Sequence, residues 1–383
     1  MRSYGPLKRQ MARRITILCA VYFVAFAFSY LYGFQRDLLE QTQYLLSEGT
    51  TVYHPLLAAI LCTLSALLLG LFLSRMLSWL PLQLKTLAWF PSLLFIGCLT
   101  HWHFPAYGDT EQSSGWTLPG VLLAIYGFCL FVAYRSSVSQ KKAMPFATIL
   151  GWNAFWMILL MLACLSVSNT DAVLHHTLRS AHCLSTGDDE GALHAAKWER
   201  HPSRTLSVMT ALALSRTGSL GDRLFAYPQP YGSKGLMPLM RDTALFYNLP
   251  MAVGRHLGYA KSDRTPITFF LELTDTMPKS TPSVRDYRLC AYLLDRRLDR
   301  FADYLLQGDT LSADLPVHYR EAWLLYQRLM PEAVTDSLHD DSLASRFEEF
   351  QTLLHESGTE KEREFRCRDH FGTTYWTYFY FKN

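Results

Sequence analysis

Five long stretches without Asp, Glu, Lys or Arg occupy the first half of the chain, and they constrain its fold more than any other feature. A bilayer core about 30 Å thick requires about 20 apolar residues of α-helix. Each stretch has about this length and is bounded by charged or turn-forming residues. We therefore predict five transmembrane helices, near residues 15–35, 55–74, 86–108, 116–134 and 146–168.

Two of these stretches allow an alternative interpretation. Pro91 interrupts the third stretch, and His101 and His103 end it. Neighbouring helices satisfy the backbone groups that a proline leaves free, so we keep it as a span. The first stretch follows three arginines and contains Ala25-Phe26-Ala27, which fits a signal-peptide cleavage pattern. Its apolar run is longer than a signal-peptide core, and we interpret it as a retained span.

The charge changes sharply after the last stretch. Residues 1–170 hold 11 Lys and Arg and 5 Asp and Glu, whereas residues 171–383 hold 25 and 28. We predict a transmembrane region over residues 1–169, with the lipid bilayer as its partner, and a soluble domain over residues 170–383. That domain concentrates no basic face, which argues against binding to nucleic acid.

The basic residues of the first half predict the orientation. With a cytoplasmic N-terminus, ten of them fall on the inner side and only Arg36 on the outer side, which follows the positive-inside rule. An odd number of spans then places the second half outside. In a bacterium this is a multi-pass protein of the inner (cytoplasmic) membrane with a periplasmic C-terminal domain.

The spans lack the groups that transport requires. Transporters and proton relays place ionisable side chains inside the membrane. Here the span interiors contain none, and Arg75 and Lys85 stand at predicted helix ends, where they can extend to the headgroups. We interpret the bundle as an anchor or as a platform for a lipid-facing partner.

The second half has a helical period throughout. A predicted helix over 188–198 and a second over 203–214 form an antiparallel hairpin, with Ser203 as an N-cap and Gly218 as a C′ residue. Small residues at the crossing are typical of tetratricopeptide-type hairpins, although the full consensus is absent. An irregular helical bundle is the alternative. We predict an all-α chain, with further helices over 283–298, 300–306, 315–329, 341–356 and 360–381.

Several short runs in the second half resemble an uncharacterised family of membrane proteins from Bacteroidota. The resemblance implies an N-terminal multi-span region and a C-terminal tetratricopeptide-like domain. It implies no catalytic residues, because the family has no established activity. The runs that carry it are Ala213–Gly218, Leu220–Phe225, Tyr227–Gly232, His318–Ala322 and Gly372–Trp376.

Two aromatic segments are candidate recognition elements. The segment Tyr227–Gly235 interrupts the helices with two prolines and two glycines, and loops of this kind often carry binding residues. We predict that Tyr227, Tyr231 and Lys234 contact a partner; the alternative is that the tyrosines pack between hairpins. Six of the last nine residues are aromatic, and we expect this tail to dock onto the domain.

Few residues in the sequence are candidates for metal binding or catalysis. His101, His103, Asp109 and Glu111 could ligate a metal near the outer membrane surface. Histidines two residues apart share a face only in extended chain, so interfacial side chains are the preferred interpretation. No nucleotide-binding, zinc-protease or serine-hydrolase motif occurs, and we expect no cofactor. At most one disulfide can form among Cys183, Cys290 and Cys367.

These observations lead to one functional interpretation and one alternative. We interpret the chain as a membrane-anchored scaffold whose extracytoplasmic helical domain binds an envelope protein or peptide. The alternative is a cell-envelope enzyme that acts on a lipid-linked glycan or lipid, with His103, Asp109 and Glu111 as the residues to test.

Overall fold

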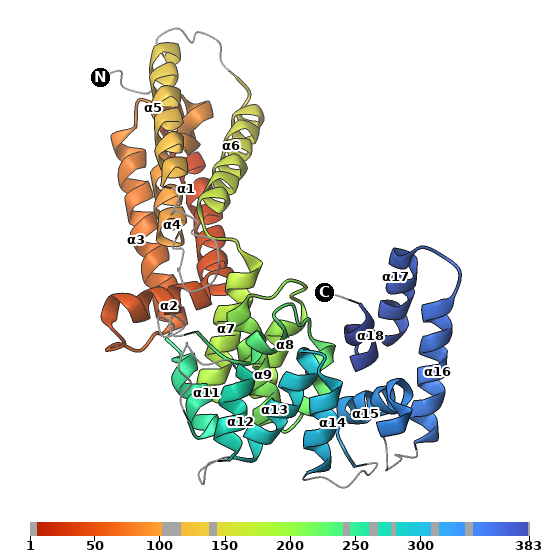
Figure 1. The fold of residues 1–383 in the computed structure, drawn as a ribbon. Helices are drawn as coiled ribbons and strands as arrows, with labels where there is room; N and C mark the ends of the chain where they lie inside the picture. Colours follow the sequence, from red (N-terminus) through yellow and green to blue (C-terminus); the bar gives the residue numbers. More distant parts are fainter. Residues whose placement is uncertain are drawn as a thin grey trace. The chain divides into compact units, whose positions relative to one another are not determined.

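The computed structural model describes residues 6–101, 116–137, 144–239, 246–259, 267–276, 281–307, 314–333 and 340–381. Every regular element in these ranges is a helix, and they contain no strand, which confirms the all-α prediction. The chain divides into two compact units (Figure 1), which we call the membrane unit (Met1–Asp171) and the helical unit (Ala172–Asn383).

The membrane unit contains five helical segments long and apolar enough to cross a membrane, as predicted. They run over Arg9–Phe34, Pro55–Met76, Leu82–Leu99, Thr117–Arg135 and Phe146–Val167. The elements that form them are α1 (Pro6–Ser29) with the π-helical η1 (Tyr30–Phe34), α3 (Pro55–Met76), the 3₁₀-helical η2 (Leu82–Trp89) with α4 (Phe90–Leu99), α5 (Thr117–Ser137) and α6 (Phe146–Val167).

The third span differs from its prediction in two ways. It begins at Leu82 rather than Thr86, because η2 precedes α4. Pro91 lies in the first turn of α4, where its missing N–H is not needed, so it begins a helix instead of interrupting one. The predicted residues after His101 lie outside the described ranges.

Lys85 also differs from expectation, because only 5% of it is exposed. Its Nζ atom donates to the carbonyl oxygens of Leu77 (3.3 Å) and Ser78 (3.4 Å), just after the end of α3. The ammonium group therefore satisfies carbonyls that the helix end leaves free. It does not extend to the headgroups.

Polar contacts hold η2 against α6. Asn153 of α6 is buried, and its Oδ1 accepts from the Thr86 backbone N–H (3.1 Å) and hydroxyl (2.8 Å). Its Nδ2 donates to the carbonyls of Leu82 and Ile149, each at 2.8 Å. Because hydrocarbon offers no alternative partners, such a network fixes the packing of two membrane segments.

A helix that the sequence did not predict joins the first two spans. α2 (Arg36–Ser47) runs across the ends of α1 and α3 instead of alongside them (Figure 1). It buries Leu38 and Leu39 against the bundle. The helix ends at Glu48 and Gly49, which adopt φ angles of 52° and 75°. Four leucines among polar residues give α2 the amphipathic character of a helix at a membrane surface.

The helical unit begins with three packed helices, α7 (Ala172–Thr186), α8 (Asp189–Lys197) and α9 (Arg204–Arg216). The predicted hairpin of α8 and α9 is confirmed. Ser203 caps α9 by accepting from Leu206 N, and Gly218 follows α9 with φ of +67°. The remaining helices of eight or more residues are α11 (Leu249–Leu257), α12 (Ile267–Asp275), α13 (Pro282–Leu294), α14 (Leu298–Leu306), α15 (Val317–Leu329), α16 (Asp341–His355) and α17 (Glu360–Phe371).

The aromatic tail docks onto the helical unit, as predicted. The expected single helix over 360–381 is instead α17 followed by α18 (Tyr375–Tyr380), because Thr374 accepts from Thr377 N and begins a new helix. Trp376 is fully buried and donates from Nε1 to the carbonyl of Glu321 on α15 (2.9 Å). All eight cysteines are free, including the three that could have formed a disulfide.

Candidate functional site

The Pro/Gly segment that the sequence singled out is fastened to the helical unit. It connects the short η4 (Leu224–Ala226) to η5 (Gly232–Leu236). Gln229 donates from Nε2 to the carbonyl of Leu224 (3.0 Å), and the Ser233 N–H donates to Asp295 Oδ1 (3.3 Å). The segment therefore has a defined position against α9 and α13.

The three predicted contact residues differ in exposure. Tyr227 is buried, with 8% of its surface exposed, and its hydroxyl lies beside Arg223. Burial raises the pKa of Tyr227, and the Arg223 guanidinium opposes this shift. Tyr231 is half-buried and Lys234 is exposed. Tyr231 and Lys234 are therefore accessible to a partner. Tyr227 is instead packed within the helical unit, the position that the alternative interpretation gave to the tyrosines.

A polar pocket of about 240 Å³ lies where this segment meets the C-terminal tail, and we call it the loop–tail pocket. Tyr227, Tyr231 and Lys234 do not line it. The sequence analysis named the segment but not these positions. Its walls are formed by Gln229, Pro230, Gly232, Leu294, Asp295, Arg296 and Tyr378.

Arg296 organises this pocket. It follows α13 with a φ of 57°, a left-handed conformation that is uncommon for a residue with a Cβ atom. Its Nη2 atom donates to the carbonyls of Tyr378 (2.7 Å) and Phe381 (3.2 Å), and the guanidinium lies 5.2 Å from the centre of the Tyr378 ring. Arg296 thus fixes the tail that forms one wall.

Tyr378 closes the same wall from the tail. Its hydroxyl donates to the carbonyl of Leu294 at the end of α13 (2.7 Å). Burial raises the pKa of Tyr378 to about 12, although the Arg296 guanidinium acts in the opposite direction. The hydroxyl therefore remains a protonated donor at neutral pH. Asp295 stays exposed beside it, so the pocket presents a carboxylate next to a guanidinium.

The predicted helix over 283–298 is wrong at its C-terminal end. In the structure α13 ends at Leu294 and α14 begins at Leu298, so Asp295, Arg296 and Arg297 form the hairpin turn. Consecutive charges do not indicate such a turn by themselves, because the five charged residues Glu360–Glu364 lie inside α17.

Of the four predicted metal ligands, His101 is the one that lies within the described residues. His101 is 6% exposed, its Nδ1 atom lies 2.5 Å from the carbonyl oxygen of Val167, and its ring centre lies 4.9 Å from that of Trp116. His103, Asp109 and Glu111 lie outside the described residues. Within the part of the chain that the structure describes, no group of three or more His, Cys, Asp or Glu side chains could hold a metal ion.

Polar side chains join the end of the first span to the residues that follow α6, a feature that the sequence analysis missed. The Tyr30 hydroxyl in η1 donates to Ser168 Oγ (2.5 Å), and Gln35 Nε2 donates to the Tyr30 hydroxyl (2.7 Å) and to the carbonyl of Asn169 (3.0 Å). The π-helical turn brings Tyr30 and Gln35 together. Such turns are frequent at functional sites, and this one connects the first span to the residues that follow α6.

Five apolar helices and a second, all-helical unit define a multi-span membrane protein. The chain matches a family of unknown function (DUF6057) over residues 13–260 and 254–382. It therefore belongs to this family. The family has no assigned activity, as the resemblance in sequence implied. No curated protein and no solved structure matches the chain.

Proposed function

We propose that this protein is a membrane-anchored scaffold that binds a segment of an envelope protein or a peptide in the loop–tail pocket. The observation that carries the proposal is the pocket itself, where Asp295 and Arg296 lie side by side under the Pro/Gly segment. A volume of about 240 Å³ holds one or two side chains, not a folded domain. The ligand is therefore an extended segment that inserts a polar or charged residue.

The architecture supports a binding role over a catalytic one. Antiparallel pairs such as α8 with α9, α13 with α14, and α16 with α17 pack against each other in sequence order. This is the arrangement by which tetratricopeptide-like domains build extended binding surfaces. Loops on such scaffolds supply the recognising residues, and the Pro/Gly segment holds that position here.

Photo-crosslinking tests the pocket. With a photoreactive amino acid in place of Pro230, we expect one discrete crosslinked envelope protein or peptide in cells, whereas the same amino acid in place of the exposed Lys361 should give none. Asp295→Asn should remove the crosslink, because it keeps an acceptor for the Ser233 N–H and takes away the charge that the ligand meets. Asp299→Asn is the matched control, since Asp299 is exposed on α14 outside the pocket. A crosslink that survives Asp295→Asn would contradict the proposal.

The proposed orientation places the helical unit on the periplasmic face of the inner membrane. It is supported by the five spans and the excess of basic residues on one side. Alkaline phosphatase fused after Asn169 should be active, and the same enzyme fused after Lys141 should be inactive. The opposite pair of activities would reverse the orientation.

A further inference from the structure

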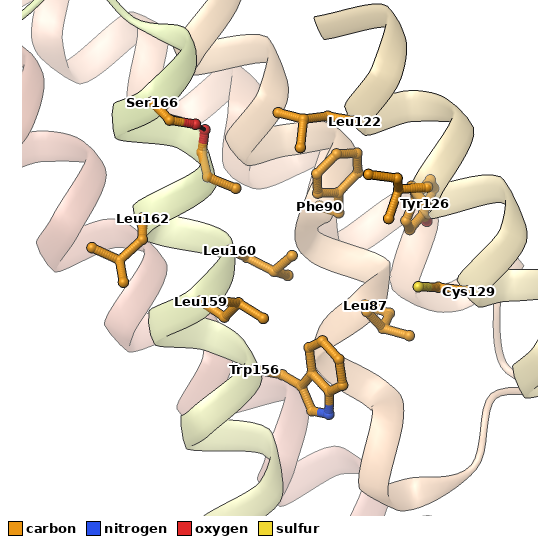
Figure 2. Close-up of a pocket in the computed structure, with 12 residues that line it drawn as sticks. Leu87, Phe90, Leu122, Tyr126, Cys129, Trp156, Leu159, Leu160, Leu162 and Ser166 are labelled. Atoms are coloured by element: carbon orange, nitrogen blue, oxygen red, sulfur yellow. Dashed lines mark hydrogen bonds between the residues drawn. The ribbon is translucent and has the colours of Figure 1, made fainter. Parts of the chain in front are cut away.

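An apolar cavity lies in the membrane unit, between α5 on one side and η2, α4 and α6 on the other (Figure 2). It opens to the surface of the bundle beside the exposed side chains of Leu159 and Leu162. Its volume is about 340 Å³, and its lining includes Phe90, Tyr126, Cys129 and Ala163. The Phe90 and Tyr126 rings stack at 4.6 Å and form one wall.

The cavity exists because α5 packs less closely than its neighbours. Gly97 of α4 fits against α6, where an added Cβ atom would lie 3.1 Å from the Cys164 carbonyl oxygen. By contrast, a Cβ atom at Gly120 or Gly127 of α5 would meet nothing within 4 Å. Only 11% of the fourth span is buried, compared with 61% of the third. α4 and α6 therefore stay together while α5 leaves a gap.

The walls offer no polar partner to a ligand. Ser166 already donates from Oγ to the carbonyl of Ala163 (2.8 Å). The Tyr126 hydroxyl and the Trp156 indole nitrogen have no hydrogen-bond partner in the described part of the chain, but both atoms are buried within the walls. Space lined only by apolar side chains binds apolar ligands rather than water, as an enclosed cavity of about 150 Å³ lined by Leu, Ile and Phe does. In a segment that spans a bilayer, the apolar medium is lipid hydrocarbon.

We infer that this cavity binds one acyl chain of a bilayer phospholipid, which enters between α5 and α6. The chain fills a volume that side chains leave open, and the dispersion contacts that it makes replace those that an empty cavity forfeits. The headgroup stays at the membrane surface, so the cavity needs no charged residue. This inference is independent of the loop–tail pocket and of the proposed function.

Native mass spectrometry of the full-length chain tests whether the cavity binds a phospholipid. After reconstitution into vesicles of palmitoyl-oleoyl phosphatidylethanolamine and phosphatidylglycerol and extraction in mild detergent, we expect one retained phospholipid per chain. Ala163→Phe fills the cavity and should abolish retention. Ala124→Phe adds the same ring to an exposed position of α5 outside the cavity and should leave retention unchanged.

A second measurement on the unmodified chain covers the case in which Ala163→Phe fails to fold. Cys129 lines the cavity, whereas Cys62 of α3 is similarly half-buried but lies elsewhere. Bound phospholipid should slow the reaction of Cys129 with a small apolar maleimide and leave Cys62 unaffected. Equal retention by Ala163→Phe and the wild-type chain, or equal protection of both cysteines, would overturn the inference.

Discussion

Replacing Trp376 with alanine will lower the free energy of unfolding of the helical unit by about 3–5 kcal/mol, the usual result of removing a large buried aromatic side chain. The Trp376 ring is fully buried, with its centre 4.8 Å from that of Phe347 and 5.9 Å from that of Phe350. Its Nε1 donor bonds to the Glu321 carbonyl. The substitution therefore leaves a cavity and removes the hydrogen bond that joins the tail to α15.

The measurement is the rate at which Cys367 reacts with a thiol reagent in increasing urea, on the full chain in detergent. Cys367 of α17 is buried in the folded unit and becomes accessible when the tail detaches. Trp198→Ala is the matched control, because Trp198 is 70% exposed at the end of α8 and its loss should change stability by less than about 0.5 kcal/mol. Equal effects of the two substitutions would show that the tail does not stabilise the unit.

Local patterns in the sequence were sufficient for most of the fold. Runs without charge located the spans, because only helices satisfy the backbone in hydrocarbon. Ser203 and Gly218 located the ends of α9 through capping geometry that depends on neighbouring residues alone. α2 was missed because Arg36, Asp37 and Glu40 lie among its apolar residues, so no run without charge marks it.

Predictions failed where a distant contact decides the local structure. From its position in the sequence, Lys85 was predicted to extend to the headgroups. In the folded chain the carbonyls of Leu77 and Ser78 lie beside its ammonium group and accept its hydrogen bonds. In the same way, the break between α17 and α18 leaves the aromatic side chains of the tail against α15. The sequence contains Thr374 as a cap, but only tertiary packing favours a new helix there over a continuous one.

One wall of the loop–tail pocket was predicted from a local pattern, and the opposite wall depends on distant contacts. Prolines and glycines correctly indicated that Tyr227–Gly235 leaves the helical pattern. They did not indicate which side chains face a cavity, because the opposite wall comes from Leu294–Arg296 and from Tyr378. The left-handed conformation of Arg296 is local, because the Arg296 N–H bonds to the Leu293 carbonyl (3.0 Å) and the Arg297 N–H to the Tyr292 carbonyl (2.8 Å) at the end of α13. The partners of its side chain are not local, since they are two carbonyls of the tail more than 80 residues away.

Glu321 provides the second large effect, because it is a carboxylate buried among neutral groups. Its Oε2 atom accepts from His318 Nδ1 (2.9 Å) and from the Tyr375 backbone N–H (2.8 Å). The Phe225 N–H points to His318 Nε2 (3.4 Å), which leaves the hydrogen of a neutral imidazole on Nδ1. The interaction is therefore a pair of hydrogen bonds to a charged acceptor, and it fastens the first residue of α18 to α15.

We expect Glu321→Ala to lower the free energy of unfolding by about 3–6 kcal/mol, since each of the two hydrogen bonds to a charged acceptor contributes about 1.5–3 kcal/mol. Glu321→Gln retains an oxygen that accepts both bonds and should cost only about 1 kcal/mol. Glu348→Ala is the control, because its exposed pair with Arg328 contributes less than about 1 kcal/mol. The urea dependence of Cys367 labelling measures all three variants. If Glu321→Gln destabilises the unit as strongly as Glu321→Ala, an ion pair with a protonated His318 holds the tail, and the neutral assignment is wrong.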